Sequence, residues 1–326
     1  MAVTHVVVTG ANGFVGRALC RVLAGNGHRI AGLVRRPGTA PGGVAEWADS
    51  APDFAGVDQC WRADHGDVDC VVHLAARVHV MNEPDNEIAQ RAFDATNVDG
   101  ALRVARAAYR HGVRRFVYVS SVKAIAGTEA SSPLREDAPA RPDDAYGRSK
   151  LGAERALARL RDELGLDVVI VRPPLVYGPG VGANFLQMMR ALSHGIPLPL
   201  ARVEAKRSLL FVDNLADALM RCALDARAEN GCFHVADDDA PTMAELLRRI
   251  GAHIGRPARL FPVPVPLLKA AGRLTGRAAQ IERLTGSLVL DASAIRSRLD
   301  WRPPHSLDDG LAATVAWFKS VRDNGG

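Results

Sequence analysis

The stretch VTGANGFVG, residues 8–16, places three glycines at intervals of three, Gly10, Gly13 and Gly16. An apolar β-branched run precedes it, and a segment with helical periodicity follows it. In a strand–loop–helix unit the first glycine permits a tight turn, the second lets backbone approach a pyrophosphate, and the third lets the helix pack closely on the sheet. The helix N-terminus then offers unpaired amides and a positive dipole end to phosphates. The stretch therefore predicts a dinucleotide-binding fold.

Apolar β-branched runs alternate with long amphipathic segments over the first half of the chain. The runs at 6–9, 29–34, 70–74, 115–120 and 168–172 predict strands, and the segments at 14–25, 89–111 and 146–164 predict helices. Continuous apolar strands separated by helices indicate a parallel sheet that is covered on both faces. The expected fold class is α/β, a doubly wound parallel sheet of the Rossmann type.

The composition changes after about residue 175, where glycine and proline become denser, as in PPLVYGPGVG and GIPLPL. We expect residues 1–174 to form the dinucleotide-binding domain and 175–326 to form a smaller α/β lobe for the substrate, with some elements exchanged between them. Open α/β sheets bind ligands at the carboxyl ends of their strands, so the lobe should lie on that side. A closing helix is expected at 307–321.

Composition and charge exclude several classes of function. The 326 residues carry 41 Lys and Arg and 36 Asp and Glu, a net charge of +5, with basic and acidic residues interleaved, which disfavours nucleic acid as a partner. The five cysteines form no C-x-x-C pair and no ligand spacing, which predicts reduced thiols in a cytoplasmic protein and no metal site. No run of eighteen apolar residues occurs, so no membrane insertion is expected, while attachment to a membrane surface stays open.

The end of the second expected strand bears on the choice of dinucleotide. Enzymes that use NAD usually place Asp or Glu there to hold the ribose hydroxyls. This chain instead reads GLVRRP, and Arg35 and Arg36 could bind a 2′-phosphate through charge-assisted hydrogen bonds. NADP is therefore favoured over NAD as the cofactor. In the alternative interpretation both arginines are solvated and the backbone holds the cofactor.

A second motif, AYGRSK at residues 145–150, puts Tyr146 and Lys150 one turn apart on the same face of a helix. By itself this spacing is typical of an ordinary surface pair. The preceding expected strand, however, delivers Ser120 and Ser121 to the carboxyl edge of the sheet. Ser121, Tyr146 and Lys150 beside a nicotinamide could move an alcohol proton while the cofactor moves the hydride. A free tyrosine has a pKa near ~10, so its use as a base requires the ammonium and a cationic ring to lower that pKa.

With these motifs in place, the chain resembles the extended short-chain dehydrogenase/reductases, in particular the NAD-dependent epimerase/dehydratase group that acts on nucleotide sugars. The resemblance covers nearly the whole chain and keeps the family's order. It rests on TGANGFVG, HLAARV at 73–78, TNVDG with Asn97, VSSVKA, YGRSK, RPPLVYGPG, RSLLFVDNLADAL and DASAIRSRLDWRP.

The resemblance implies a role for individual residues. Catalysis would fall to Ser121, Tyr146 and Lys150. The cofactor would contact Gly10, Gly13, Phe14, Val15, Asp53, Phe54, Leu74, Ala75, Ala76, Asn97, Ser120, Tyr146, Lys150, Pro173 and Pro174. Asn184, Arg207 and Arg283 would hold the nucleoside diphosphate of the substrate, and the alternative for the two arginines is a surface ion pair. His73 is expected to be a satisfied core histidine.

Several reactions share this scaffold. Dehydratases of the family carry an Asp-Glu pair after the central hydroxyl residue, where this chain has Val122 and Lys123, so dehydration is disfavoured. A 4-epimerase and a 4-keto reductase of a UDP-hexose or UDP-N-acetylhexosamine remain. Leu175, where UDP-galactose 4-epimerase has an asparagine, and the missing acid after the second strand both lean toward reduction. The resemblance through VSSVKA and RLTGSLVLD is to bacterial UDP-glucose 4-epimerase-like enzymes, which implies a role in surface polysaccharide (lipopolysaccharide) synthesis.

Two hypotheses from other classes are weighed beside these. A reductase of a non-nucleotide carbonyl would have no use for Asn184 and Arg207, and a non-catalytic cofactor-sensing protein would have lost Tyr146 or Lys150. The resemblance also implies a homodimer, in which the helices at 89–111 and 146–164 pair with those of a second copy in a four-helix bundle.

Overall fold

The computed structural model describes residues 3–61, 66–78, 86–127, 129–130 and 132–323. Its centre is a parallel sheet with the strand order β3-β2-β1-β4-β5-β6-β9. The strands are β1 (His5–Thr9), β2 (Arg29–Val34), β3 (Ala45–Ala48), β4 (Cys70–His73), β5 (Arg115–Val119), β6 (Asp167–Arg172) and β9 (Cys232–His234). The chain passes from β1 to β2 and β3 on one side and then returns to add β4 on the other. This reversal confirms the doubly wound α/β fold.

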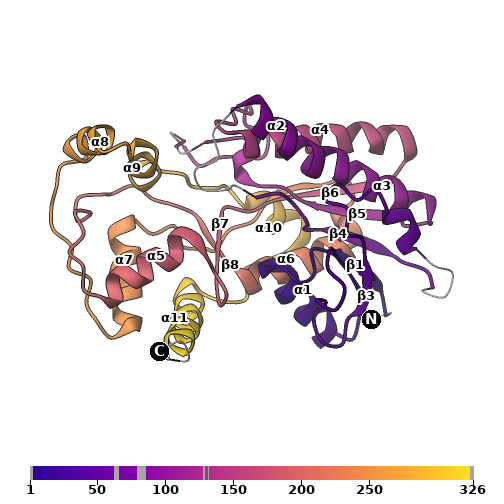
Figure 1. The fold of residues 1–326 in the computed structure, drawn as a ribbon, viewed down its shortest axis with the longest axis horizontal. Coiled ribbons are helices and arrows are strands. Elements are labelled where there is room, and N and C mark those ends of the chain that lie inside the picture. The colour runs from indigo at the N-terminus through magenta and orange to yellow at the C-terminus, as the bar shows by residue number, and fades with distance from the viewer. Residues whose placement is uncertain (1–2, 62–65, 79–85, 128, 131, 324–326) are drawn as a thin grey trace.

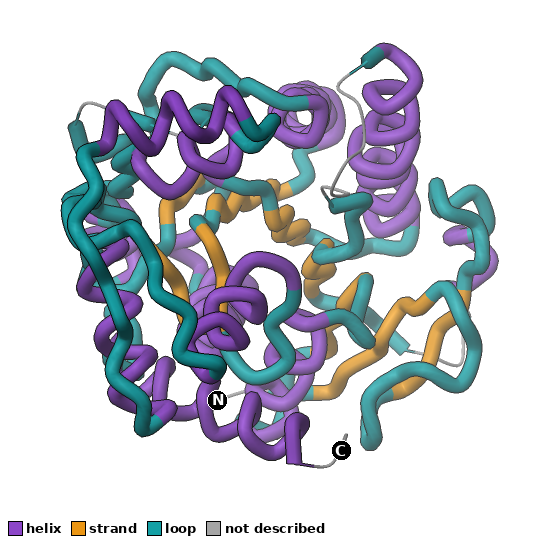
Figure 2. Tube along the Cα trace, turned by 60° about the vertical axis from the view of Figure 1, so that its left-hand side comes forward, coloured by secondary structure: helices purple, strands orange, loops and turns teal. Residues whose placement is uncertain are grey.

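Helices cover both faces of the sheet (Figures 1 and 2). One face carries α1 (Phe14–Gly25) and α6 (Val212–Leu224), and the other carries α2 (Glu87–Asp94), α3 (Gly100–Arg110) and α4 (Ala145–Leu164). Because successive residues of a strand point to opposite faces, Val6 and Val8 enter the core under α1 and α6, whereas Val7 enters the core under α3 and α4. The first of these cores continues into the smaller lobe, where it includes Phe185 and Phe211.

Five strands agree with the expected runs to within one residue at each end, but β3 and β9 were not predicted. Strand β3 is a short edge strand in which only Trp47 is buried, so its sequence, AEWA, lacks a continuous apolar run. Strand β9 has three residues and pairs with β6 in the register Val171 to Phe233. It lies far along the chain, beyond residue 175, and sequence periodicity does not reveal which sheet such a short strand joins.

The expected single helix at 89–111 is wrong in one respect, because a π-helical turn, Ala95–Asp99, divides it into α2 and α3. The turn contains Asn97, whose buried side chain bonds the backbone of Arg77, accepting from its N–H at 2.8 Å and donating to its carbonyl at 3.0 Å. The same amide donates to the Ser149 hydroxyl on α4 at 2.9 Å. Periodicity could not show this wider turn, since it is fixed by contacts with two other segments.

The smaller lobe lies at the carboxyl side of the sheet (Figure 1). It contains the parallel pair β7 (Leu175–Tyr177) and β8 (Leu209–Phe211), together with α5 (Ala183–Ser193), α7 (Met243–Ile254), α8 (Val265–Leu274), α9 (Ala278–Thr285) and α11 (Leu307–Asp323). A short helix, α10 (Ser293–Leu299), contacts β9 of the main sheet. In the described ranges no helix is both long enough and apolar enough to cross a bilayer.

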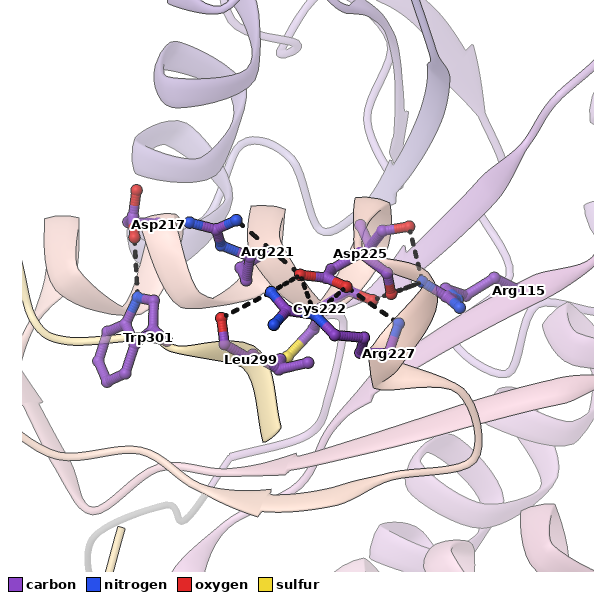
Figure 3. Close-up of polar contacts among 9 residues, drawn as sticks. Arg115, Asp217, Arg221, Cys222, Asp225, Arg227, Leu299 and Trp301 are labelled. Atoms are coloured by element: carbon purple, nitrogen blue, oxygen red, sulfur yellow. Dashed lines mark hydrogen bonds and ion pairs between the residues drawn. The ribbon is translucent and has the colours of Figure 1, made fainter. Parts of the chain in front are cut away.

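Polar contacts fasten the carboxyl end of α6 to the sheet (Figure 3). The Arg115 guanidinium, at the start of β5, donates to the carbonyl of Asp225 at 2.6 Å and to that of Cys222 at 3.3 Å. Cys222 lies in the last turn of α6 and Asp225 is its C-cap, so the cation also meets the negative end of the helix dipole. Trp301 adds a second tie, because its indole N–H donates to Asp217 on α6 at 2.8 Å.

A buried ion pair joins α4 to the end of β6. The Arg172 guanidinium donates to both carboxylate oxygens of Glu154, at 2.9 and 2.6 Å, and the two side chains are 9% and 5% exposed. A third donor of Arg172 reaches the carbonyl of Glu136 at 2.8 Å, and the Glu136 carboxylate accepts from the backbone N–H of His234 at 2.8 Å. The pair thus ties α4, the 121–144 connection and β9 to one point at the carboxyl edge of the sheet.

We predict that Glu154→Ala lowers the free energy of unfolding by about 3–5 kcal/mol, because it leaves the Arg172 charge buried without its counterion. Urea denaturation followed by tryptophan fluorescence would measure the change. The matched control is Glu87→Ala, which removes an exposed i,i+4 pair with Arg91 at 3.5 Å and should cost less than about 1 kcal/mol. Equal effects of the two substitutions would contradict the role given to the buried pair.

Candidate functional site

The glycine-rich loop has the geometry that its sequence predicts. Gly10 has a φ of +69° and donates its N–H to the Leu33 carbonyl at 2.9 Å, which turns the chain sharply after β1. A Cβ on Gly16 would lie 2.2 Å from the Gly10 carbonyl oxygen, so a side chain there would push α1 away from the loop. Gly13 is the N-cap of α1, and the free amides of the first turn, which includes Phe14 and Val15, follow it.

The segment after β4 closes the other side of this loop. A Cβ on Gly10 would lie 3.1 Å from the Ala75 nitrogen, so the two backbones are in close contact. The Thr9 hydroxyl accepts from the Ala75 N–H at 3.1 Å and lies 3.0 Å from Nδ1 of His73. Leu74, Ala75 and Ala76 are half-buried, and they form the wall next to the glycines. Together the loop and the wall are a backbone-lined trough at the amino end of α1.

The loop after β2 is braced against the glycine-rich loop. The Asn12 amide donates to the Thr39 hydroxyl at 2.9 Å, and that hydroxyl donates to the Arg36 carbonyl at 2.6 Å. The Glu46 carboxylate accepts from the N–H groups of Gly38 and Ala40 at 2.8 and 3.0 Å. Sequence reasoning missed this network, since nothing in the spacing of these residues signals it.

Arg35 and Arg36 lie on the rim of the trough. Both are exposed at the point where β2 ends, next to the braced loop. Their role in binding a 2′-phosphate stays a prediction.

Asp53 and Phe54, which the family resemblance places at the cofactor, both have contacts within the protein. The Asp53 carboxylate forms an ion pair with Arg103 on α3 at 2.5 Å, and its carbonyl accepts from the same guanidinium at 2.8 Å. The Phe54 ring is buried and packs edge-on against His73, with ring centroids 5.5 Å apart. The Asp53 carboxylate thus has a partner within the protein. Phe54 packs against His73, the last residue of the strand that leads into the trough wall.

Ser121, Tyr146 and Lys150 converge at the carboxyl edge of β5. Lys150 is 2% exposed, and its ammonium donates to the Val119 carbonyl at 2.9 Å and lies 5.9 Å from the Tyr146 ring centroid. The Ser121 hydroxyl is the hydrogen-bond partner of the Tyr146 phenol. Helix α4 presents the pair one turn apart because Asp144 caps its start, accepting from the Gly147 N–H at 2.8 Å.

The pKa values of Tyr146 and Lys150 are shifted in opposite directions. Burial raises the pKa of Tyr146 to about 12, against a smaller opposing effect of the Ser121 hydroxyl. Burial lowers the pKa of Lys150 to about 7, although the nearby Glu154 carboxylate opposes this shift. The polypeptide therefore holds a neutral phenol over a weakly basic amine. The lowering of the tyrosine pKa that its use as a base requires depends on the positive charge of a bound nicotinamide ring as well as on the ammonium, so it stays a prediction for the complex with cofactor.

Several buried polar atoms beside this trio have no hydrogen-bond partner among the described residues. They are the Ser120 hydroxyl, the Tyr118 hydroxyl and Nε2 of His73. Tyr118 was not predicted as a site residue, yet its ring lies 4.7 Å below the Lys150 ammonium. The prediction that His73 is satisfied was only half right. Burial lowers its pKa to about 3, so the ring is neutral at neutral pH, and within the described part of the chain only Nδ1 has a hydrogen-bond partner, the Thr9 hydroxyl at 3.0 Å.

Asn97, Pro173 and Pro174 frame the trio. The Asn97 side chain is committed to the Arg77 backbone and to Ser149, so it fixes the trough wall relative to α4. Pro173 and Pro174 are buried where β6 ends, and the Pro173 carbonyl accepts from the Val122 N–H at 3.0 Å. Lys123 pairs with Asp144, the cap of α4, so the two residues after Ser121 have structural partners.

Two arginines of the smaller lobe interact electrostatically. Arg207, next to β8, is partly buried, and burial together with the positive charge of Arg283 on α9 lowers its pKa. Like charges brought together in a partly buried site indicate a place for an anion. Asn184 is exposed in the first turn of α5. Within the described ranges no group of three or more His, Cys, Asp or Glu side chains could hold a metal ion.

Comparisons with known proteins agree with this geometry. The family described as the NAD dependent epimerase/dehydratase family matches residues 6–236. A UDP-glucose 4-epimerase of Vibrio cholerae is 38% identical over 250 residues, 76% of this chain and 76% of that protein. A UDP-glucose 4-epimerase of Mycolicibacterium smegmatis is 30% identical over 335 residues, 96% and 98% of the two chains.

The solved structures include MoeE5 in complex with UDP-glucuronic acid and NAD. It is 26% identical, aligns with 97% of this chain and 99% of its own, and superposes with a TM-score of 0.75. The match to the family covers well over half of the chain and includes the glycine-rich loop, the trio and the end of β9. The chain therefore belongs to the NAD-dependent epimerase/dehydratase family of extended short-chain dehydrogenase/reductases.

Proposed function

We propose that this enzyme moves a hydride at carbon 4 of a UDP-linked hexose or N-acetylhexosamine. The observation that carries the proposal is the convergence of Ser121, Tyr146 and Lys150 at the sheet edge, beside the glycine-rich trough. Relatives named UDP-glucose 4-epimerase and the UDP-sugar bound in MoeE5 support the substrate class.

The residues suit a dinucleotide in the trough. The positive φ of Gly10 and the close approach at Gly16 leave backbone amides next to the α1 N-terminus, where a pyrophosphate would bind. A bound nicotinamide supplies the hydride donor and acceptor, and its oxidised ring supplies a positive charge. We assign the unpartnered Ser120 hydroxyl and the prolines after β6 to the ring end of the trough.

Proton transfer falls to Tyr146. As a neutral phenol it can give its proton to the oxygen of a sugar ketone as the hydride arrives. In the reverse direction, the phenolate oxygen of Tyr146 takes the proton from the sugar alcohol. The Ser121 hydroxyl, already bonded to the phenol, would hold the sugar oxygen. Lys150 in its protonated form stabilises the phenolate, which is why its buried position near Glu154 matters.

The diphosphate of the substrate would bind between Arg207 and Arg283. Burial and the charge of Arg283 lower the pKa of Arg207, so a bound anion would stabilise the charged form of that guanidinium. A guanidinium can also bind phosphate oxygens in pairs. We include Asn184 in this site from the family resemblance. The same site argues against a reductase of a non-nucleotide carbonyl, because a neutral apolar substrate would bring no anion to the partly buried positive charge of Arg207.

Two outcomes of the hydride transfer remain candidates. The named relatives favour 4-epimerisation, in which the hydride returns to the other face of the ketone. Reduction of a 4-keto sugar is the second candidate, since Arg35 and Arg36 on the trough rim suit NADP, a cofactor that a reductase consumes. Dehydration is disfavoured because the two positions after Ser121, where dehydratases of the family carry an acid pair, hold other residues. Val122 is buried, and Lys123 forms an ion pair with Asp144.

Three further parts of the proposal come from the family resemblance. We propose a cytoplasmic enzyme, a role in surface polysaccharide synthesis, and a homodimer. In the dimer, α4 and the helices of residues 89–111, α2 and α3, meet those of a second copy in a four-helix bundle. The outer surfaces of α3 and α4, which include exposed Tyr109, are available for that contact.

The reaction is tested by incubating the enzyme with UDP-hexoses and with UDP-4-keto sugars while following NADPH absorbance and product NMR. An epimerase yields the 4-epimer with no net change in absorbance, and a reductase consumes NADPH in proportion to product. In either case Tyr146→Phe should lower kcat by about 10²–10⁴-fold while the cofactor affinity stays the same. Tyr109→Phe, an exposed tyrosine on α3, is the matched control. Turnover retained in Tyr146→Phe would remove the phenol from the mechanism.

The cofactor preference is tested by Arg35→Asp, measured through the dissociation constants of NADP and NAD. We expect NADP to bind roughly tenfold to a hundredfold more weakly, since a charge-assisted contact is replaced by repulsion, while NAD changes little. Arg155→Asp, at an exposed position on α4, makes the same charge change elsewhere. An unchanged ratio would mean that the Arg35 side chain never reaches the ribose phosphate.

The buried Lys150 should make stability depend on pH in a defined window. Its pKa is about 7 in the folded protein and 10.5 in the unfolded chain, so below pH 7 both states hold the proton. Between these values only the unfolded chain binds it, and the free energy of unfolding should rise with pH by roughly 1.4 kcal/mol per unit. The difference between wild type and Lys150→Met, measured by urea denaturation at several pH values, isolates this effect. A difference that stays constant across the window would contradict the burial of the amine.

A further inference from the structure

Helix α8 turns an apolar face to solvent. Its inward face is made by Leu268 and Gly272, which are buried, and a Cβ on Gly272 would lie 2.7 Å from the Ile281 side chain on α9. On the opposite face, residues 267, 270, 271 and 274 are Leu, Ala, Ala and Leu, an i, i+3, i+4, i+7 pattern, and all four are exposed. Leu267 is 59% exposed and Leu274 is 89% exposed. A surface helix normally turns its apolar residues toward the core and its polar residues toward solvent.

The apolar face lies in a basic part of the chain. Residues 256–286 contain six Lys and Arg and one acid, whereas the whole chain contains 41 and 36, so the remaining residues balance at 35 of each sign. The segment itself therefore has a net charge of +5. Lys269, Arg273 and Arg277 belong to α8 and the turn that follows it, and in the part of the chain that the structure describes they form no ion pair.

The position of the α8–α9 hairpin, residues 265–285, leaves this surface accessible. The hairpin lies at the end of the molecule farthest from β3 and stands apart from the main sheet (Figure 1). The connection before it contains Pro262 and Pro264, and Pro266 lies in the first turn of α8; these prolines limit backbone freedom. Phe261 adds a 44% exposed ring.

We propose that the α8–α9 hairpin docks this enzyme on an anionic phospholipid surface. Leu267 and Leu274 would enter the boundary between headgroups and acyl chains, and the flanking cations would meet lipid phosphates. The four-residue stripe extends over about 10 Å of helix, which suits shallow insertion rather than spanning. A second copy of this chain is a poorer occupant, because it would bring the same positive charges against each other.

Docking would orient the proposed substrate site. Arg283 lies on α9, and its charge acts on Arg207, so α9, but not the apolar stripe of α8, belongs to the site assigned to the diphosphate. An enzyme held by this hairpin would open its substrate site close to the lipid surface. The docking proposal itself stands on the exposed stripe and the charge distribution, and it does not depend on which sugar reaction the enzyme performs.

The test is co-sedimentation of the full chain with vesicles of phosphatidylglycerol and phosphatidylcholine, compared with vesicles of phosphatidylcholine alone. We expect binding to the anionic vesicles only, and we expect it to weaken as salt is raised. The double variant Leu267→Glu/Leu274→Glu should lower the partition coefficient at least tenfold, because it places carboxylates where acyl chains would contact the helix.

The matched control is Val3→Glu/Val321→Glu, which makes the same charge change at two other exposed apolar positions and should bind like wild type. Turnover of a soluble UDP-sugar should be the same in wild type and both variants, which verifies the fold. Wild-type protein that stays in the supernatant, equal binding to neutral vesicles, or undiminished binding by the Leu267→Glu/Leu274→Glu variant would each overturn the proposal. Self-association without lipid that this variant abolishes would instead identify a second copy as the occupant.

Discussion

The ion pair between Glu154 and Arg172 is the contact on which the candidate site depends. It is bidentate, nearly dry, and placed one helical turn beyond Lys150, so it holds α4 against the end of β6. That position brings Tyr146 over the edge of β5 and next to Ser121. The pair also places a negative charge near Lys150, whose ammonium would otherwise be buried with only the Val119 carbonyl as a partner. Glu154 therefore both stabilises the fold, through Arg172, and acts electrostatically on Lys150 in the candidate site.

The site retains features that a purely stable protein would avoid. Burial favours the uncharged forms of Tyr146 and Lys150, the hydroxyls of Ser120 and Tyr118 lack partners in the described chain, and Arg207 lies near a second cation. Each of these features lowers the stability of the fold. Each group would also be stabilised by a ligand that supplies an anion, a hydrogen bond or a positive charge. A dinucleotide and a sugar diphosphate have the complementary groups. Ligand binding is thus expected to stabilise the protein as well as to complete the site.

Sequence reasoning was most successful where one local pattern decides the structure. The glycines at 10, 13 and 16 fixed the first turn, and continuous apolar runs fixed five strands, because backbone sterics and burial on both faces act within a few residues. It failed where distant segments decide. Strands β3 and β9 are too short to carry a periodic signal, and the π-helical turn around Asn97 exists because its amide serves Arg77 and Ser149. The ion pairs of Asp53 with Arg103 and of Glu154 with Arg172 also could not be predicted from the sequence, because the partners lie far apart along the chain.

The sequence by itself determined that this chain folds as a doubly wound sheet with a dinucleotide trough, and it identified a hydroxyl, a phenol and an amine as candidates for proton transfer. Only the tertiary structure decided that Tyr146 is a neutral phenol, that Lys150 is a weak base, and that the apolar stripe of α8 faces solvent. The physical reason is that residue types and spacing set local conformation, whereas a pKa or the exposure of a face depends on the desolvation and charge contributed by every segment packed around it.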